Sequence, residues 1–167
     1  MRESWVMKRK LRLLLVDDDE NDTFFLQRAV EKCEGRLEVH CLHHGEEAIK
    51  YLERAGELTD RHCYPLPQMI LLDLKMPAVT GFDVLRLIKS NPEWRHIVVI
   101  IFSSSSDPKD VLRAYDLGAN SYVSKSDFAE LGEMVAAMEG FWCGINIFPD
   151  LSVDPKAGAP ALESGHK

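Results

Sequence analysis

Cysteines are few in this chain, and their spacing does not fit a zinc motif. The sequence contains no C-x-x-C pair, so we do not expect a structural zinc site. The four cysteines stand far apart, at positions Cys33, Cys41, Cys63 and Cys143. We interpret them as reduced residues that contribute to packing.

Long apolar runs are absent as well. The longest runs have the length of a strand and are too short to cross a bilayer as a helix. Residues 1–10, which we assign to an N-terminal extension, carry charge but lack the apolar centre of a signal peptide. The sequence therefore predicts a cytoplasmic protein without a membrane partner.

Positive charge is in deficit. Lys and Arg number 20 against 27 Asp and Glu, which gives a formal net charge of −7. Because no basic stripe stands out, the sequence argues against a nucleic-acid partner. The length of 167 residues and the apolar fraction of 46% fit one globular domain with a core.

What the chain does contain is a regular alternation of strand-like and helix-like segments. Gly35 and Gly118 are placed to end the first and fourth helices, and Ser126 or Asp127 to cap the fifth. Five βα units predict an α/β fold, a doubly wound five-stranded parallel sheet with helices on both faces. The predicted strands cover residues 11–16, 37–42, 69–72, 97–102 and 121–123.

Two stretches interrupt this alternation. Residues 55–67 are polar, contain two prolines, and are predicted to form an extended loop. Beyond Gly144 the chain becomes rich in Pro, Gly, Ala and Ser. We therefore place one domain at residues 11–143 and a C-terminal extension at 144–167, largely flexible after about residue 150 and without a second domain.

Acidic residues directly follow two of the predicted strands. Asp17, Asp18 and Asp19 come after residues 11–16, and Asp73 comes after residues 69–72. With the strand order 2-1-3-4-5 these strands flank the switch point, where open α/β sheets bind ligands. Carboxylates crowded there repel one another unless a cation lies among them, and Mg²⁺ prefers oxygen ligands. The pattern predicts a Mg²⁺ site with an aspartate free to accept a phosphoryl group.

The last two strands end in residues suited to the same chemistry. The run from Ser103 to Ser106 follows the fourth strand and offers short hydroxyls as donors to phosphate. Lys125 follows the fifth strand and offers a point charge for a phosphate oxygen. The strand ends at this edge thus supply what phosphoryl transfer requires, which is positioning and charge neutralisation.

In this order and spacing, the motifs resemble the receiver domain of two-component response regulators. The resemblance covers roughly residues 11 to 142 and implies a CheY-like, flavodoxin-like (βα)5 fold with sheet order 2-1-3-4-5. The motifs are Leu-Leu-Val-Asp17-Asp18-Asp19, Leu-Leu-Asp73-Leu-Lys-Met-Pro77 with Gly81, then Ser103, and Gly118-Ala-Asn-Ser-Tyr122-Val-Ser-Lys125.

The resemblance implies which residues hold the ion and the phosphoryl group. Asp73 would accept the phosphoryl group from a sensor histidine kinase. Asp17, Asp18 and Asp73 would hold Mg²⁺, with the backbone carbonyl of Lys75 as a further ligand.

It also implies a switch. Ser103 would move its hydroxyl toward the phosphoryl group, Lys125 would pair with that group, and Tyr122 would change rotamer on phosphorylation. Because no effector domain is expected, the phosphorylated surface would signal by protein contact. We expect such a chain to be a signalling module that assists its own phosphorylation and dephosphorylation, not an enzyme.

A narrower resemblance is to the stand-alone regulators that serve bacterial phytochrome kinases. It rests on the long loop before the third strand, on Ser126 after Lys125, and on the pair Phe141-Trp142 with a Pro-ended extension. The apolar character of Phe141–Phe148 on an otherwise polar tail predicts a homodimer.

The sequence differs from the family pattern at some positions, and two other functions compete with the receiver assignment. Ser126 stands where the family usually has Pro, so a cis bond is not expected there, and Ser103 replaces the commoner Thr. Asp19 is an alternative ligand to Asp17, although we prefer it as a helix cap. The rival functions are a Mg²⁺-dependent aspartyl phosphohydrolase, which would want an aspartate where Lys75 stands, and a binding module independent of phosphorylation.

Overall fold

The structure is a computed structural model of the chain. It describes residues 10–33, 35–56, 65–126 and 131–149. The predicted N-terminal extension before residue 10, the tail after residue 149 that was predicted to be largely flexible, Cys63 and the expected cap Asp127 lie outside the described residues. Within them, no helix has the length and apolar character needed to span a membrane.

Five parallel strands form one sheet in the order β2-β1-β3-β4-β5, which confirms the predicted fold. β1, β3 and β4 lie inside the sheet, where both faces are covered, and their sequences are therefore almost continuously apolar. The strands are β1 (Leu11–Val16), β2 (Leu37–Leu42), β3 (Met69–Leu72), β4 (Val98–Ser103) and β5 (Ser121–Ser124).

The last two strands reach one residue further than predicted. β4 begins at Val98 because Ile97 still donates to the carbonyl of Trp94 in the preceding turn. Both strands end on a serine, since Ser103 pairs with Ser124 in the parallel ladder. Apolar periodicity does not detect a strand end that is polar.

The helices alternate with the strands as expected. Asp19, Thr80 and Asp107 cap the first, third and fourth helices with their side chains. Gly35 and Gly118 adopt positive φ beyond the ends of their helices. The helices are α1 (Glu20–Lys32), α2 (Gly45–Gly56), α3 (Gly81–Ser90), α4 (Pro108–Asp116) and α5 (Leu131–Met138), followed by a short π-helix, η1 (Glu139–Cys143). Residues 55 and 56 are thus helical, and not part of the loop predicted there.

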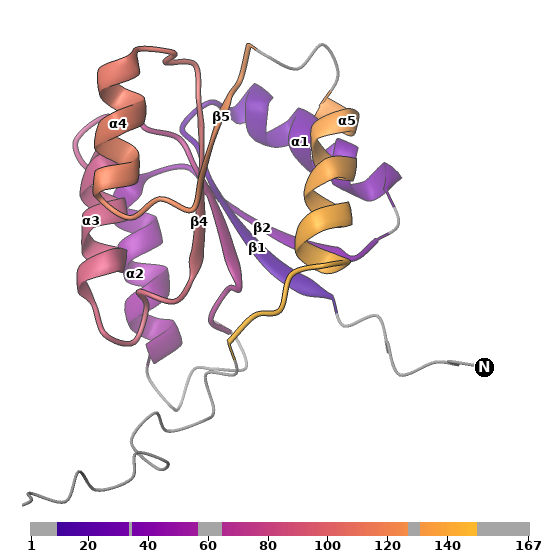
Figure 1. The fold of residues 1–167 in the computed structure, drawn as a ribbon, viewed down its shortest axis with the longest axis horizontal. Helices are drawn as coiled ribbons and strands as arrows, with labels where there is room; N and C mark the ends of the chain where they lie inside the picture. Colours follow the sequence, from indigo (N-terminus) through magenta and orange to yellow (C-terminus); the bar gives the residue numbers. More distant parts are fainter. Residues whose placement is uncertain (1–9, 34, 57–64, 127–130, 150–167) are drawn as a thin grey trace, which may run out of the picture.

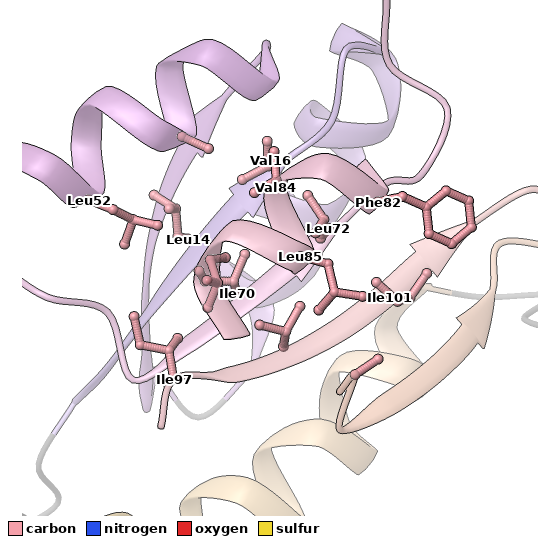
Figure 2. Close-up of a cluster of buried hydrophobic side chains, with 14 of the residues drawn as sticks. Leu14, Val16, Leu52, Ile70, Leu72, Phe82, Val84, Leu85, Ile97 and Ile101 are labelled. Atoms are coloured by element: carbon pink, nitrogen blue, oxygen red, sulfur yellow. The ribbon is translucent and has the colours of Figure 1, made fainter. Parts of the chain in front are cut away.

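The helices form two layers around the sheet (Figure 1): α1 and α5 cover one face, and α2, α3 and α4 cover the other. Leu14, Ile70 and Leu52 belong to the core under α2 and α3 (Figure 2) and are almost fully buried. Truncating one such side chain to alanine typically costs about 2–5 kcal/mol. These cores hold the strands in register, so their C-terminal ends meet along one edge.

Candidate functional site

Three carboxylates converge at that edge. Oxygens of Asp17, Asp18 and Asp73 lie within 4.8 Å of one another. Asp17 and Asp73 are only 1% and 5% exposed, whereas Asp18 is open to solvent. The sheet positions both buried residues, because the amide of Asp73 donates to the carbonyl of Val16 at 2.9 Å, and that of Asp17 to Leu42 at 3.0 Å.

A lysine from the far strand reaches into this cluster. Lys125 Nζ lies 2.7 Å from Asp17 Oδ2, 2.8 Å from Asp22 Oδ2 and 3.8 Å from Asp73 Oδ1. Its backbone amide donates to the carbonyl of Ser103 at 2.9 Å, which anchors the lysine beside β4. The lysine therefore contacts Asp17 and Asp22 closely and pairs only loosely with Asp73.

Burial dominates the electrostatics of the cluster. Desolvation raises the pKa of Asp17 to about 6, although the contact with Lys125 opposes the shift. Desolvation also raises the pKa of Asp73, again against the charge of Lys125. For Lys125, burial disfavours the ammonium, but its contacts with Asp17 and Asp22 outweigh that cost and raise its pKa. The lysine stays charged while the buried carboxylates resist ionisation.

Asp19 does not join the cluster. Its carboxylate accepts from the amide of Asn21 at 2.8 Å and from that of Asp22 at 3.4 Å, as a helix cap does. Its own amide donates to Asp17 Oδ1 at 3.0 Å. Of the two alternatives considered for the metal ligand, the geometry therefore favours Asp17.

The loop after β3 is tightly folded beneath Asp73. The amide of Gly81 donates to the carbonyl of Leu74 at 3.1 Å. A Cβ at position 81 would overlap the backbone oxygen of Asp73 and lie 2.8 Å from Leu74 Cα. The side chain of Lys75 points into solvent. Only glycine lets the start of α3 approach the acidic residue this closely.

Ser103 and Tyr122 both lie beside the loop between β4 and α4. Ser103 is fully buried, and its hydroxyl accepts from the amide of Ser105 at 3.3 Å. The hydroxyl of Tyr122 donates to the carbonyl of Ser105 at 2.8 Å, so the ring is directed toward the loop. No cis peptide bond occurs among the described residues, the Lys125–Ser126 bond included.

The sequence analysis did not predict two contacts at the site. Asp22 shares Lys125 with Asp17, and Ser105 donates to Asp110 Oδ2 at 2.6 Å. Asp22 lies in the first turn of α1, close in sequence to the acidic run that ends at Asp19, and that proximity could have pointed to it. Its partner 103 residues further along the chain could not be inferred from local spacing.

The carboxylates fit a hard divalent cation. Asp73 Oδ1 is buried and accepts no hydrogen bond from the described residues, and it lies too far from Lys125 for a close contact. One ammonium does not balance three carboxylates, and carboxylate oxygens are the ligands that Mg²⁺ prefers. Asp17, Asp18 and Asp73 would hold such an ion, which supplies the positive charge that the cluster lacks.

A buried aspartate in an acidic cluster, with a lysine and a serine beside it at the C-terminal edge of a 2-1-3-4-5 sheet, is the arrangement expected of a phosphoacceptor domain. The family model "Response regulator receiver domain" matches residues 13–136. The chain belongs to this family, which confirms the resemblance seen in the motifs.

Several relatives have known structures or curated names. Response regulator Rcp1 of Synechocystis sp. is 34% identical over 131 residues, which cover 78% of this chain and 87% of Rcp1. The crystal structure of Mn²⁺-bound Rcp1 matches with a TM-score of 0.73 at 32% identity, over 84% of this chain and 99% of that one. The phosphorylated cyanobacterial phytochrome response regulator RcpA matches with a TM-score of 0.75 at 32% identity, with the same coverage.

Proposed function

We propose that this response regulator accepts a phosphoryl group on Asp73 in a Mg²⁺-dependent step. The observation that carries the proposal is the convergence of Asp17, Asp18 and Asp73 within 4.8 Å, with Lys125 at 2.7 Å from Asp17. Asp73 is the acceptor because it is buried at the centre and keeps an oxygen free of hydrogen bonds from the described residues. Lys75 completes the ion site with its backbone carbonyl.

The transfer is a displacement at phosphorus. A carboxylate oxygen of Asp73 attacks the phosphoryl group of a phosphohistidine, and the P–N bond breaks as the imidazole leaves with the electron pair. The product is a mixed anhydride on Asp73. Lys125, now 3.8 Å from Asp73 Oδ1, would move toward a new phosphoryl oxygen.

The donor is a sensor histidine kinase, and we propose a phytochrome kinase. The similarity to RcpA, described as a phytochrome response regulator, supports this choice. So does the similarity to the bacteriophytochrome response regulator RtBRR, which is 36% identical with a TM-score of 0.65. We place the reaction in the cytoplasm, with no nucleic acid or membrane as partner.

Phosphorylation would act on the loop that Ser103 and Tyr122 share. Movement of the Ser103 hydroxyl toward the phosphoryl group would shift Ser105, whose carbonyl holds the hydroxyl of Tyr122. Tyr122 would then change rotamer and alter the surface around α4 and β5. The output is a changed contact surface for a protein partner.

Two further proposals concern the whole chain. We place the receiver domain at residues 11–143, between the extensions 1–10 and 144–167. We also propose a homodimer that uses the segment Phe141–Phe148, because Phe141, Ile145 and Ile147 expose 49%, 74% and 92% of their surfaces.

Intact-mass analysis after acetyl phosphate treatment tests the central proposal. With Mg²⁺ we expect one phosphoryl adduct, and none with EDTA or in Asp73→Asn. Asp116→Asn, at the exposed C-terminal end of α4, is the matched control and should keep the adduct. An adduct that persists in Asp73→Asn would refute the assignment. Sustained turnover of a small phosphate ester would instead favour an aspartyl phosphohydrolase.

A further inference from the structure

A chain of three serine hydroxyls joins the two loops that carry Ser103 and Lys125. Ser124 Oγ lies 3.3 Å from Ser106 Oγ and 2.7 Å from Ser126 Oγ. Ser106 belongs to the loop after β4, and Ser126 directly follows Lys125 at the end of β5. The hydroxyl chain therefore spans the gap between the two loops.

The hydroxyl of Ser124, in the middle of this chain, uses all of its hydrogen-bonding capacity. Ser124 Oγ also accepts from the backbone amide of Ser126 at 3.3 Å. A hydroxyl has one proton to donate and two lone pairs to accept with, so Ser124 must donate to one neighbouring serine and accept from the other. The roles of Ser124 towards its two neighbours are therefore opposite, and Ser124 cannot reverse its hydroxyl without a change at those neighbours.

The backbone connects the same two loops. The amide of Lys125 donates to the carbonyl of Ser103 at 2.9 Å. The main-chain bond lies at the ends of the strands, and the serine chain continues the connection beyond them. A displacement of one loop is therefore transmitted to the other through two successive links.

We infer that Ser124 is a positioning residue that makes Ser103 and Lys125 approach the phosphoryl group together. The inference rests on the proposed phosphorylation of Asp73. Ser103 and Lys125 must both reach oxygens of one small group, and a fixed distance between their loops places them in advance. Ser124 itself is buried, and within the described residues its hydroxyl forms hydrogen bonds with Ser106 and Ser126 and none with Asp17, Asp18 or Asp73.

Removing this hydroxyl should leave the fold intact. Ser106 and Ser126 are both exposed, so water satisfies their hydroxyls when Ser124 is absent. Ser124→Ala should therefore slow phosphorylation by acetyl phosphate by about 5-fold, which is the factor expected from the loss of one ordinary hydrogen bond. The affinity for Mg²⁺ should not change, because Asp17, Asp18 and Asp73 are untouched.

The experiment measures the rate of phosphorylation by acetyl phosphate, Mg²⁺ affinity and thermal unfolding in matched variants of the full chain. Ser121→Ala makes the same change in β5, at a hydroxyl without a hydrogen bond to the described residues, and should keep the wild-type rate. Ser124→Thr retains the hydroxyl and should restore the rate. Ser106→Ala breaks the Ser106–Ser124 link from its other side, so its effect and that of Ser124→Ala should not add in the double variant.

Each outcome bears on a different claim. A wild-type protein that takes no phosphoryl group refutes the proposed function. A phosphorylated wild type with equal rates for Ser124→Ala and Ser121→Ala refutes the positioning role of Ser124. Fully additive effects of Ser106→Ala and Ser124→Ala would show that the two serines act separately, and would also overturn the inference.

Discussion

The ammonium of Lys125 lies 2.7 Å from a buried oxygen of Asp17, closer than its 3.8 Å distance from Asp73. The lysine is therefore held more closely by Asp17 than by Asp73, the proposed phosphoacceptor. An ion bound at Asp17 and a phosphoryl group on Asp73 would each compete with this contact between Lys125 and Asp17. The state of the site and the position of Lys125 are consequently coupled.

Replacement of Lys125 should destabilise the ion-free protein. Lys125→Met retains the apolar stem but leaves buried carboxylates without a counter-charge, which typically costs about 3–5 kcal/mol. We expect urea unfolding at pH 7.5 in EDTA to show a loss of that order, and Mg²⁺ to recover most of it. Lys109→Met, at an exposed lysine of α4, is the control. Equal losses in both variants would contradict the role assigned to Lys125.

Asp17 should make the ion-free protein sensitive to pH. Its pKa is raised to about 6 by burial, so the folded state holds the proton more tightly than the unfolded chain does. The stabilisation from the protonated carboxyl is present below about pH 4 and is lost as the pH rises through about 6. Asn at this position stays neutral. The free energy of unfolding of Asp17→Asn should therefore equal that of the wild type at pH 4 and be higher by about 3 kcal/mol at pH 7.5.

Urea unfolding in EDTA across this pH range provides the measurement. Asp19→Asn is the control with the opposite sign, because hydrogen bonds from Asn21 and Asp22 lower the pKa of Asp19. The charge of this exposed cap contributes stability above the unfolded pKa, so its removal should lower the stability at neutral pH, while Asn keeps the hydrogen bonds of the cap. A stability difference for Asp17→Asn that stays constant with pH would refute the assignment.

The sheet and the central carboxylates were predictable because they depend on local signals. Apolar runs such as Leu11–Val16 and Met69–Leu72 indicate buried strands, and the acids that follow them must emerge at one edge when the strands are parallel neighbours. The order and spacing of the motifs further predicted that Ser103 and Lys125 act at the same site. Both residues do lie at the expected edge.

Contacts between distant loops were not predictable in the same way. The partnership of Asp22 with Lys125 depends on how α1 packs against the end of β5. The serine chain through Ser124 depends on the separation of two loops, to within a fraction of an ångström. No periodicity in the sequence encodes such distances, because packing of the whole domain determines them.

Gly81 should not tolerate a side chain. A Cβ there would overlap the backbone oxygen of Asp73, and a backbone atom cannot move aside as the end of a flexible side chain can. We expect Gly81→Ala to cost about 3 kcal/mol or more, as severe overpacking does. Gly132→Ala is the matched control, because that helical position is open and alanine there should stabilise by about 0.5–1 kcal/mol. Thermal unfolding of both variants is the measurement, and similar shifts would refute the close approach.

Ala78 occupies a backbone conformation that favours glycine. Its φ of 61° lies in the left-handed region, which costs a residue with a Cβ about 1–2 kcal/mol. Ala78→Gly should therefore raise the free energy of unfolding by about 1 kcal/mol, despite the greater freedom of glycine in the unfolded chain. Ala136→Gly, in the exposed face of α5, should lower it by a similar amount. A loss of stability in both variants would contradict the strain at Ala78.

The exposed apolar side chains near the C-terminus should mediate self-association. Trp142 and Phe148 pack toward the core of α1 and α5, which anchors the segment, while Ile145 and Ile147 face outward. An anchored segment that exposes apolar surface is suited to bury it against a second copy. In light scattering across a concentration series, the wild type should approach twice its monomer mass, and Ile145→Asp with Ile147→Asp should remain monomeric. Leu112→Asp, on the exposed face of α4, should leave the association unchanged. A wild-type mass that stays monomeric at every concentration would remove the dimer proposal.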